Sequence, residues 1–244
     1  MRRKGEEEII KNDISPHPPF SSSPLLLKQI MSKIIVLIGA PGAGKGTQAR
    51  LLEEQRGIPQ ISTGDIFREM KKADTSLARE VQEIMASGKL ISDELTYKIV
   101  KERTLREDCS GNYILDGYPR TAIQAEQLEE LAKEQGKEIQ AIEVDVPKEE
   151  LMKRLIGRRN CPVCNEIYNI YYKPPKKDNV CDFHPETQLN HRADDYEETV
   201  KVRLATYEEL TKPLLDYYEK TGRLKKIDGT GDVETIYREL ETLI

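Results

Sequence analysis

The sequence predicts an α/β protein whose parallel sheet is covered by helices on both faces. Short apolar, β-branched runs at 33–38, 113–116 and 139–146 alternate along the chain with longer segments rich in helix formers. Strands buried on both faces have this composition, and such alternation is typical of a parallel sheet. A glycine-rich turn at 39–47 joins the first of these strands to the first helix.

The other elements are placed by apolar runs and by the residues that end helices. We expect strands at 33–38, 59–62, 113–116, 139–146 and 224–228. We expect helices at 45–56, 62–70, 75–87, 93–106 and 121–135, then from Pro147 onward, at 193–218 and at 232–243. Gly57 and Gly88 end two of these helices, and Pro213 interrupts the long one.

The turn at 39–47 reads Gly-Ala-Pro-Gly-Ala-Gly-Lys-Gly-Thr, the pattern of a phosphate-binding loop between a strand and a helix. Its glycines let the backbone approach a polyphosphate closely, and the helix N-terminus behind it adds partial positive charge. Lys45 can reach the β- and γ-phosphates, and the Thr47 hydroxyl can contact Mg²⁺. We therefore predict a P-loop NTPase fold that binds a nucleoside triphosphate through Gly42, Ala43, Gly44, Lys45, Gly46 and Thr47.

Composition restricts the partners and the location that we expect. The 244 residues can form one large domain or a core with insertions, and they carry a net charge of −5. A negative charge argues against non-specific nucleic-acid binding, and no apolar run is long enough to span a membrane. Three of the four cysteines are clustered, which does not favour pairwise disulfides. We expect a cytoplasmic protein.

Residues 1–30 have the composition of a disordered leader. Charged residues dominate up to Asp13, and the stretch 15–24 holds four prolines and four serines. The apolar run 25–27 is too short for a secretory signal, and the acidic run 6–8 argues against the remaining alternative, an organelle transit peptide. We expect Met31 to be the natural start and the first 30 residues to be an optional extension.

A segment rich in Tyr, Asn, Pro and Lys, 161–191, contains two candidate pairs of metal ligands. Cys161 with Cys164, and Cys181 with His184, have equal spacing, and sixteen residues separate the pairs. Three thiolates and an imidazole favour Zn²⁺ over Mg²⁺ or Ca²⁺, and over an iron–sulfur cluster. Because the protein fills all four positions, we predict a structural zinc that stabilises a small module without a large core.

Several further motifs show that the chain resembles the adenylate kinase family, in its bacterial form with a long, zinc-bearing lid. The resemblance runs from Ser32 to the C-terminus and rests jointly on these segments. They are 39–47, 62–65 with Arg68, 116–120 with Gln124, 154–159, 192–195 with Arg203, and 228–230.

The resemblance implies a P-loop core, 31–61, 92–156 and 196–244, with a helical monophosphate-binding insertion at 62–91 and a lid at 157–195. It implies reversible Mg²⁺-dependent transfer, ATP + AMP = 2 ADP, by a monomer that serves adenine nucleotide homeostasis. AMP would contact Thr63, Arg68, Ile91, Gly117, Arg120, Gln124, Arg192 and Arg203, with Gln124 reading adenine. ATP would contact Arg154, Arg158 and Gly231 beside the loop, and Asp116 would hold Mg²⁺ through water.

Transfer would depend on Lys45, Arg120, Arg158, Arg192 and Arg203, because two polyanions repel each other and must be aligned. The AMP phosphate is already an anionic nucleophile, so no general base is needed.

Two positions depart from the family pattern. His184 stands where the family usually has Cys or Asp, and Gly231 stands where a longer side chain is common. We expect the metal site to bind zinc with His184 as a ligand, and we expect little loss of ATP binding from Gly231.

Two alternatives stay open at this point. One is a kinase of UMP or CMP, since base choice depends on the shape of the pocket. The other is a P-loop regulatory ATPase with a zinc ribbon that binds nucleic acid or a protein.

Overall fold

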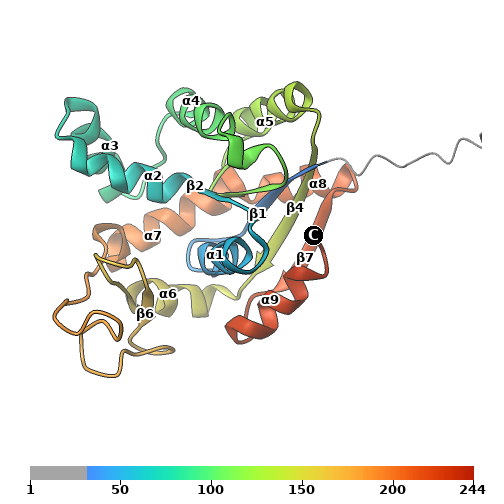
Figure 1. The fold of residues 1–244 in the computed structure, drawn as a ribbon. Helices are drawn as coiled ribbons and strands as arrows, with labels where there is room; N and C mark the ends of the chain where they lie inside the picture. The colour runs from blue at the N-terminus through green and yellow to red at the C-terminus, as the bar shows by residue number, and fades with distance from the viewer. Residues whose placement is uncertain (1–31) are drawn as a thin grey trace, which may run out of the picture. The chain divides into compact units, whose positions relative to one another are not determined.

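In the computed structural model, residues 32–244 form a five-stranded parallel sheet with the strand order β2-β3-β1-β4-β7 (Figure 1). The strands are β1 (Lys33–Ile38), β2 (Gln60–Ser62), β3 (Tyr113–Asp116), β4 (Glu138–Asp145) and β7 (Leu224–Asp228). The register places Val36 of β1 beside Leu115 of β3 and Ala141 of β4. The α/β fold expected from the sequence is confirmed. The predicted leader at 1–30 lies outside the described residues.

Nine α-helices occur within residues 32–244. They are α1 (Lys45–Arg56), α2 (Thr63–Glu69), α3 (Ser76–Ala86), α4 (Asp93–Thr104), α5 (Ala122–Gln135), α6 (Lys148–Ile156), α7 (Glu197–Thr206), α8 (Pro213–Lys220) and α9 (Val233–Glu241). Hydroxyl side chains begin several of them: Ser62, Thr75 and Thr121 each accept a bond from a backbone N–H in the first turn. Gly57 and Gly136, both with φ in the left-handed region, end α1 and α5.

Alternate residues of β1 enter the two halves of the core. Ile34 and Val36 pack with residues of α4, α5 and α8, whereas Ile35 and Leu37 pack with residues of α1, α6, α7 and α9. Figure 1 shows α4 and α5 on one side of the sheet and α1, α6 and α9 on the other. Both faces of the central strand are therefore apolar, as a doubly covered parallel strand requires.

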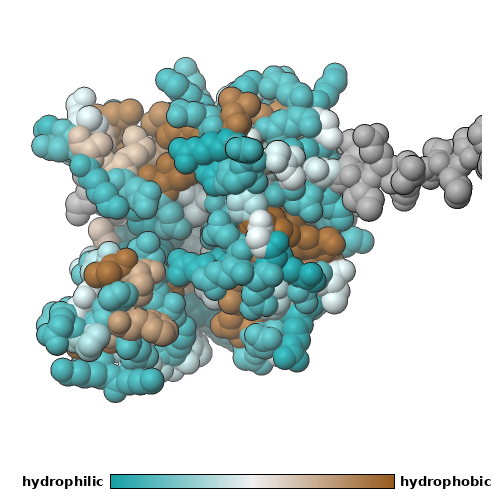
Figure 2. All heavy atoms as spheres, viewed as in Figure 1, coloured by the Kyte–Doolittle hydropathy of each residue, from teal (hydrophilic) through white to brown (hydrophobic). Residues whose placement is uncertain are grey.

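Two segments extend from this core toward the carboxyl ends of the strands. The segment α2–α3 packs around Phe67, Val81 and Ile91. The lid, residues 157–195, contains the antiparallel pair β5 (Arg158–Asn160) and β6 (Ile167–Asn169), in which Arg159 faces Tyr168. Figure 2 shows a hollow between these two segments in a mostly hydrophilic surface.

Two expected helix limits differ from the structure. Pro147 is extended, with ψ 142°, and precedes α6 instead of opening it. The predicted helix 193–218 is a short 3₁₀ turn, then α7, then a π-helical turn at Tyr207–Thr211, then α8. The interruption thus precedes Pro213, whose missing N–H suits the first position of α8. Within residues 32–244, none of the helices has the length and apolar character needed to cross a membrane.

Candidate active site

A cavity of about 1210 Å³ opens where β1 and β3 end, between α2, the lid and α7. Ligand pockets for one small molecule commonly have about 300–1,000 Å³. The cavity is therefore large enough for more than one nucleotide-sized ligand. It lies outside the carboxyl ends of the strands, which is the usual place for a ligand on an open parallel sheet.

The phosphate-binding loop forms one wall of this cavity. Gly42 and Gly44 have φ of 88° and 97°, which side-chain-bearing residues rarely adopt. A Cβ on Gly42 would also lie 3.0 Å from Cγ of Leu155. The Lys45 ammonium donates to the carbonyls of Gly39, at 2.7 Å, and Ala40, at 3.0 Å, so it lies across the loop.

Lys45 lies in an environment that disfavours its charge. Burial lowers its pKa to about 8; Asp116 opposes this effect, and the guanidinium groups of Arg120, Arg203 and Arg158 add to it. Asp116 is the last residue of β3, and its carboxylate lies close to the first turn of α1. A Cβ on Gly46 of that turn would lie 3.1 Å from Oδ2 of Asp116. A bound polyphosphate would offset the repulsion among these cations.

Arg120 is held by three hydrogen bonds that leave its terminal nitrogens available to the cavity. Its Nε donates to the carbonyl of Gly117 at 2.7 Å, and its backbone N–H donates to Oε1 of Gln124 at 2.8 Å. The Thr211 hydroxyl donates to the Arg120 carbonyl at 2.9 Å. Gly117, with φ 81°, has no room for a side chain, because a Cβ would lie 2.5 Å from Arg120 Nη2.

The π-helical turn Tyr207–Thr211 brings Thr211 to Arg120. Lys212 N–H bonds the carbonyl of Tyr207, five residues earlier, so this turn holds one more residue than an α-helical turn. Sequence analysis missed Thr211; the only signal was the interruption expected near Pro213.

A buried carboxylate links the lid to α7. Asp195, which is fully buried, accepts two bonds from Arg158, at 2.7 and 2.6 Å, and one from Arg203 at 2.8 Å. Burial disfavours the cation, yet Asp195 raises the pKa of Arg158 above its usual value. Asp195 therefore fixes two of the predicted phosphate-binding arginines in one arrangement.

Arg192, at the end of the lid, is the least compensated cation of this group. Its Nε is buried, and no hydrogen-bond partner for it occurs among residues 32–244. Burial lowers its pKa to about 9, and repulsion by Arg158 and Arg68 adds to the effect. Uncompensated guanidinium groups that converge on a cavity form a strong site for phosphate.

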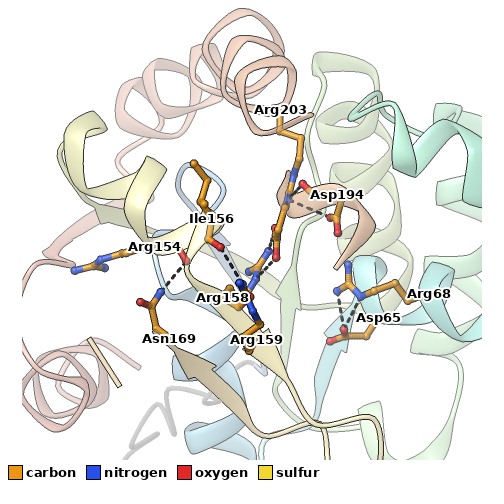
Figure 3. Close-up of polar contacts among 10 residues, drawn as sticks. Asp65, Arg68, Arg154, Ile156, Arg158, Arg159, Asn169, Asp194 and Arg203 are labelled. Atoms are coloured by element: carbon orange, nitrogen blue, oxygen red, sulfur yellow. Dashed lines mark hydrogen bonds and ion pairs between the residues drawn. The ribbon is translucent and has the colours of Figure 1, made fainter. Parts of the chain in front are cut away.

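The segment α2 contributes the opposite wall. Thr63 donates to the Gly117 carbonyl at 2.9 Å, and Arg68 pairs with Asp65 at 2.6 Å (Figure 3). Burial raises the pKa of Asp65, but the neighbouring Arg68 holds it below its ordinary value.

The far end of the cavity is formed by Arg154 and residues of the lid. Arg154 donates to the carbonyl of Gly229 at 2.8 Å, and its guanidinium lies 6.0 Å from the ring of Tyr172. Gly231 lines this end without crowding, since a Cβ there would meet nothing closer than 3.6 Å. Tyr172 and Asn169 also line the cavity, although sequence analysis did not select them.

The predicted nucleotide residues all lie around this one cavity. They are Gly42, Ala43, Gly44, Lys45, Gly46, Thr47, Thr63, Arg68, Ile91, Asp116, Gly117, Arg120, Gln124, Arg154, Arg158, Arg192, Arg203 and Gly231. Segments that are far apart in the sequence thus contribute to a single site.

The predicted metal ligands form a second cluster, inside the lid. Ligand atoms of Cys161, Cys164, Cys181 and His184 lie within 4.8 Å of one another. Cys181 Sγ is 3.8 Å from Cys164 Sγ and 3.7 Å from His184 Nδ1. Ligands about 2.0–2.3 Å from a tetrahedral zinc are roughly 3.5–3.8 Å apart, so the four residues fit this ion. The Tyr168 hydroxyl lies 3.6 Å from Cys181 Sγ, a contact that sequence analysis missed.

Comparison with known proteins agrees with this geometry. The family model described as Adenylate kinase matches residues 37–223. The chain belongs to the adenylate kinase family. An adenylate kinase of Archaeoglobus fulgidus is 48% identical over 86% of this chain and 97% of that protein. Adenylate kinases of Oceanobacillus iheyensis and Bacillus subtilis are 47% and 46% identical over 86% of this chain, and 98% and 97% of their own lengths.

Membership in the adenylate kinase family confirms the resemblance drawn from the sequence motifs. The family model includes the phosphate-binding loop from Leu37 onward, the lid and α7. The chain is accordingly a phosphotransferase of the nucleoside monophosphate kinase class. This assignment argues against a regulatory ATPase with a zinc ribbon.

Proposed function

We propose that the protein catalyses the reversible reaction ATP + AMP = 2 ADP. The observation that carries this proposal is one cavity in which a phosphate-binding loop faces arginines from α2, the turn after β3, the lid and α7. A single triphosphate would not require cations on all of these walls, whereas two aligned polyanions would.

In the proposed arrangement, the triphosphate of ATP lies on the loop 42–47, with Lys45 and Arg158 at its terminal phosphates. Arg154 and Gly231 line the part of the cavity assigned to the ATP base. AMP lies against α2 and β3, with its phosphate near Arg68, Arg120, Arg192 and Arg203. Thr63, Ile91, Gly117 and Gln124 enclose its nucleoside.

The reaction forms a bond from an AMP phosphate oxygen to the γ-phosphorus and breaks the bond from that phosphorus to the β,γ-bridging oxygen of ATP. The attacking oxygen is already anionic, so this chain supplies no general base. Lys45, Arg120, Arg158, Arg192 and Arg203 offset the repulsion between the two nucleotides and stabilise charge in the transition state. Bound Mg²⁺ would neutralise phosphate charge, held near Thr47 and, through water, Asp116.

The insertion at 62–91 and the lid at 157–195 would shield the reacting phosphates from water, which competes with AMP as acceptor. A tetrahedral Zn²⁺ at Cys161, Cys164, Cys181 and His184 would stabilise the lid and take no part in transfer, because no coordination position is left open. Cysteines that bind a metal and form no disulfide suit the reducing cytoplasm, where we place the protein. We propose that it acts there as a monomer on nucleotides, without a nucleic-acid or membrane partner.

An acceptor screen tests the proposed function. With MgATP as donor, we expect phosphorylation of AMP at a rate well above that of CMP, UMP or GMP, since Gln124 offers hydrogen bonds at the base site. Preference for a pyrimidine would assign the enzyme to another nucleotide. Slow ATP hydrolysis without transfer would contradict the proposal.

The lowered pKa of Lys45 predicts a pH dependence of ATP binding. Lys45 loses its proton near pH 8 in the free protein. Triphosphate favours the charged lysine, so binding above pH 8 must take up a proton and affinity should fall toward pH 10, by up to about tenfold per pH unit. Calorimetry in buffers of different ionisation enthalpy measures the uptake. In Lys45→Met, affinity at pH 7 should be lower and the uptake reduced; equal proton uptake in both proteins would contradict the assignment.

A further inference from the structure

The side-chain amide of Gln124 is bonded on both of its ends within the protein. Gln124 lies in the first turn of α5, lines the cavity and is only 2% exposed. Its Oε1 accepts from the backbone N–H of Arg120 at 2.8 Å, and its Nε2 donates to Oδ1 of Asp93 at 2.8 Å. The same oxygen of Asp93 accepts from the Thr121 hydroxyl at 3.0 Å.

These partners determine which way the amide points. A backbone N–H can only donate and an ionised carboxylate can only accept, so turning the amide over would break both bonds. The amide has two donor and two acceptor positions, and the protein uses one of each. One N–H of Nε2 and one lone pair of Oε1 therefore remain, in a fixed order, for a ligand in the cavity.

Adenine and a 6-oxopurine present opposite patterns to such an amide. Adenine offers a donor at its 6-amino group and an acceptor at N1, while hypoxanthine offers an acceptor at O6 and a donor at N1. An amide in fixed order matches only one of these two patterns when the sugar and phosphate set the position of the base. An amide that can turn over matches either.

We propose that Asp93 is a positioning residue that selects a 6-aminopurine monophosphate over a 6-oxopurine monophosphate by fixing the amide of Gln124. The inference rests on the proposed function, because it assumes that the base of AMP lies at Gln124. Asp93 begins α4 and lies behind Gln124, outside the residues that line the cavity. It acts on the base only through the amide.

The test compares AMP with IMP, which differ only at the 6-position and N1 of the base. For Asp93→Leu, we expect the ratio of kcat/KM for AMP over IMP to fall about tenfold or more from its wild-type value. The change should lie mainly in KM, because the arginines at the phosphates are untouched. Asp93→Asn, whose side chain can either accept or donate, should give an intermediate ratio.

Asp108→Leu is the matched control, since Asp108 pairs with Arg103 away from the cavity. It should leave the AMP/IMP ratio unchanged. Dissociation constants for AMP and IMP, with melting temperatures, separate selectivity from folding. A folded Asp93→Leu protein with the wild-type ratio would overturn the role of Asp93. A wild-type protein that transfers no phosphoryl group to AMP would overturn the proposed function instead.

Discussion

Replacing Arg120 with methionine is expected to lower kcat for phosphoryl transfer by roughly 10²- to 10³-fold. The guanidinium donates from Nε to the Gly117 carbonyl, while Gln124 and Thr211 hold the backbone of Arg120, so the cation has a fixed position at the cavity. Burial, followed by repulsion from Arg203 and Arg68, lowers its pKa to about 10, so the protein holds this charge against a cost. A cation held in a fixed position stabilises the transition state of phosphoryl transfer, in which negative charge builds up on the phosphate oxygens.

Initial rates with saturating MgATP and varied AMP measure the effect, and melting temperatures show whether the variant is folded. Arg103→Met is the matched control, because Arg103 is partly buried and paired with Asp108 outside the cavity. It should lose stability and keep its rate. Near-normal turnover by Arg120→Met would contradict the role assigned to Arg120 in phosphoryl transfer.

Loss of zinc is expected to unfold the lid while leaving the sheet intact. The lid has only a small buried cluster, Cys161, Tyr168, Cys181 and Leu189, of which two members are predicted metal ligands. For His184→Ala, we expect weaker zinc binding and a melting temperature lower by roughly 5 °C or more, since about 1 kcal/mol corresponds to about 2–4 °C at this chain length. Activity should fall because Arg158 and Arg192 stand at the ends of the lid.

His184→Cys should retain the ion, because the ring nitrogen that faces Cys181 is Nδ1, the one nearer to Cβ, and a thiolate reaches almost as far. Metal analysis gives the zinc content, and hydrogen exchange locates the loss: Cys181 N–H, bonded to the Thr187 carbonyl, should lose protection while β1 keeps it. Equal melting and exchange in wild type and His184→Ala would show that the cluster does not stabilise the lid.

Features set by neighbouring residues could be predicted from the sequence. The loop around Lys45 has its glycines, its strand and its helix within a short stretch, so local rules suffice. The ligand pairs around Cys161 and Cys181 are likewise local, and their convergence followed from their equal spacing.

Arg158 and Arg159 are neighbours with different roles. The first bonds Asp195, and the second donates to backbone carbonyls (Figure 3).

The residues that sequence analysis missed act through partners far away in the chain. The motif 192–195 includes Asp195 but does not show its partner, Arg158, which lies 37 residues earlier in the chain. Thr211 reaches Arg120 across 91 residues, and Asp93 reaches Gln124 across 31. No local pattern marks such pairs, because each depends on how separate elements pack.

The extra residue in the turn Tyr207–Thr211 limits how the length of this helical segment can change. An α-helix advances about 100° per residue, so deleting one residue here would rotate everything after it by that angle relative to Arg203. Thr211 would leave the Arg120 carbonyl, or Leu214 and Tyr218 would leave the core where they are buried. Substitutions in this segment can be absorbed one side chain at a time, but a one-residue deletion must disturb either the arginine or the core. Homologues that keep both should therefore vary here in residue type and keep the same length.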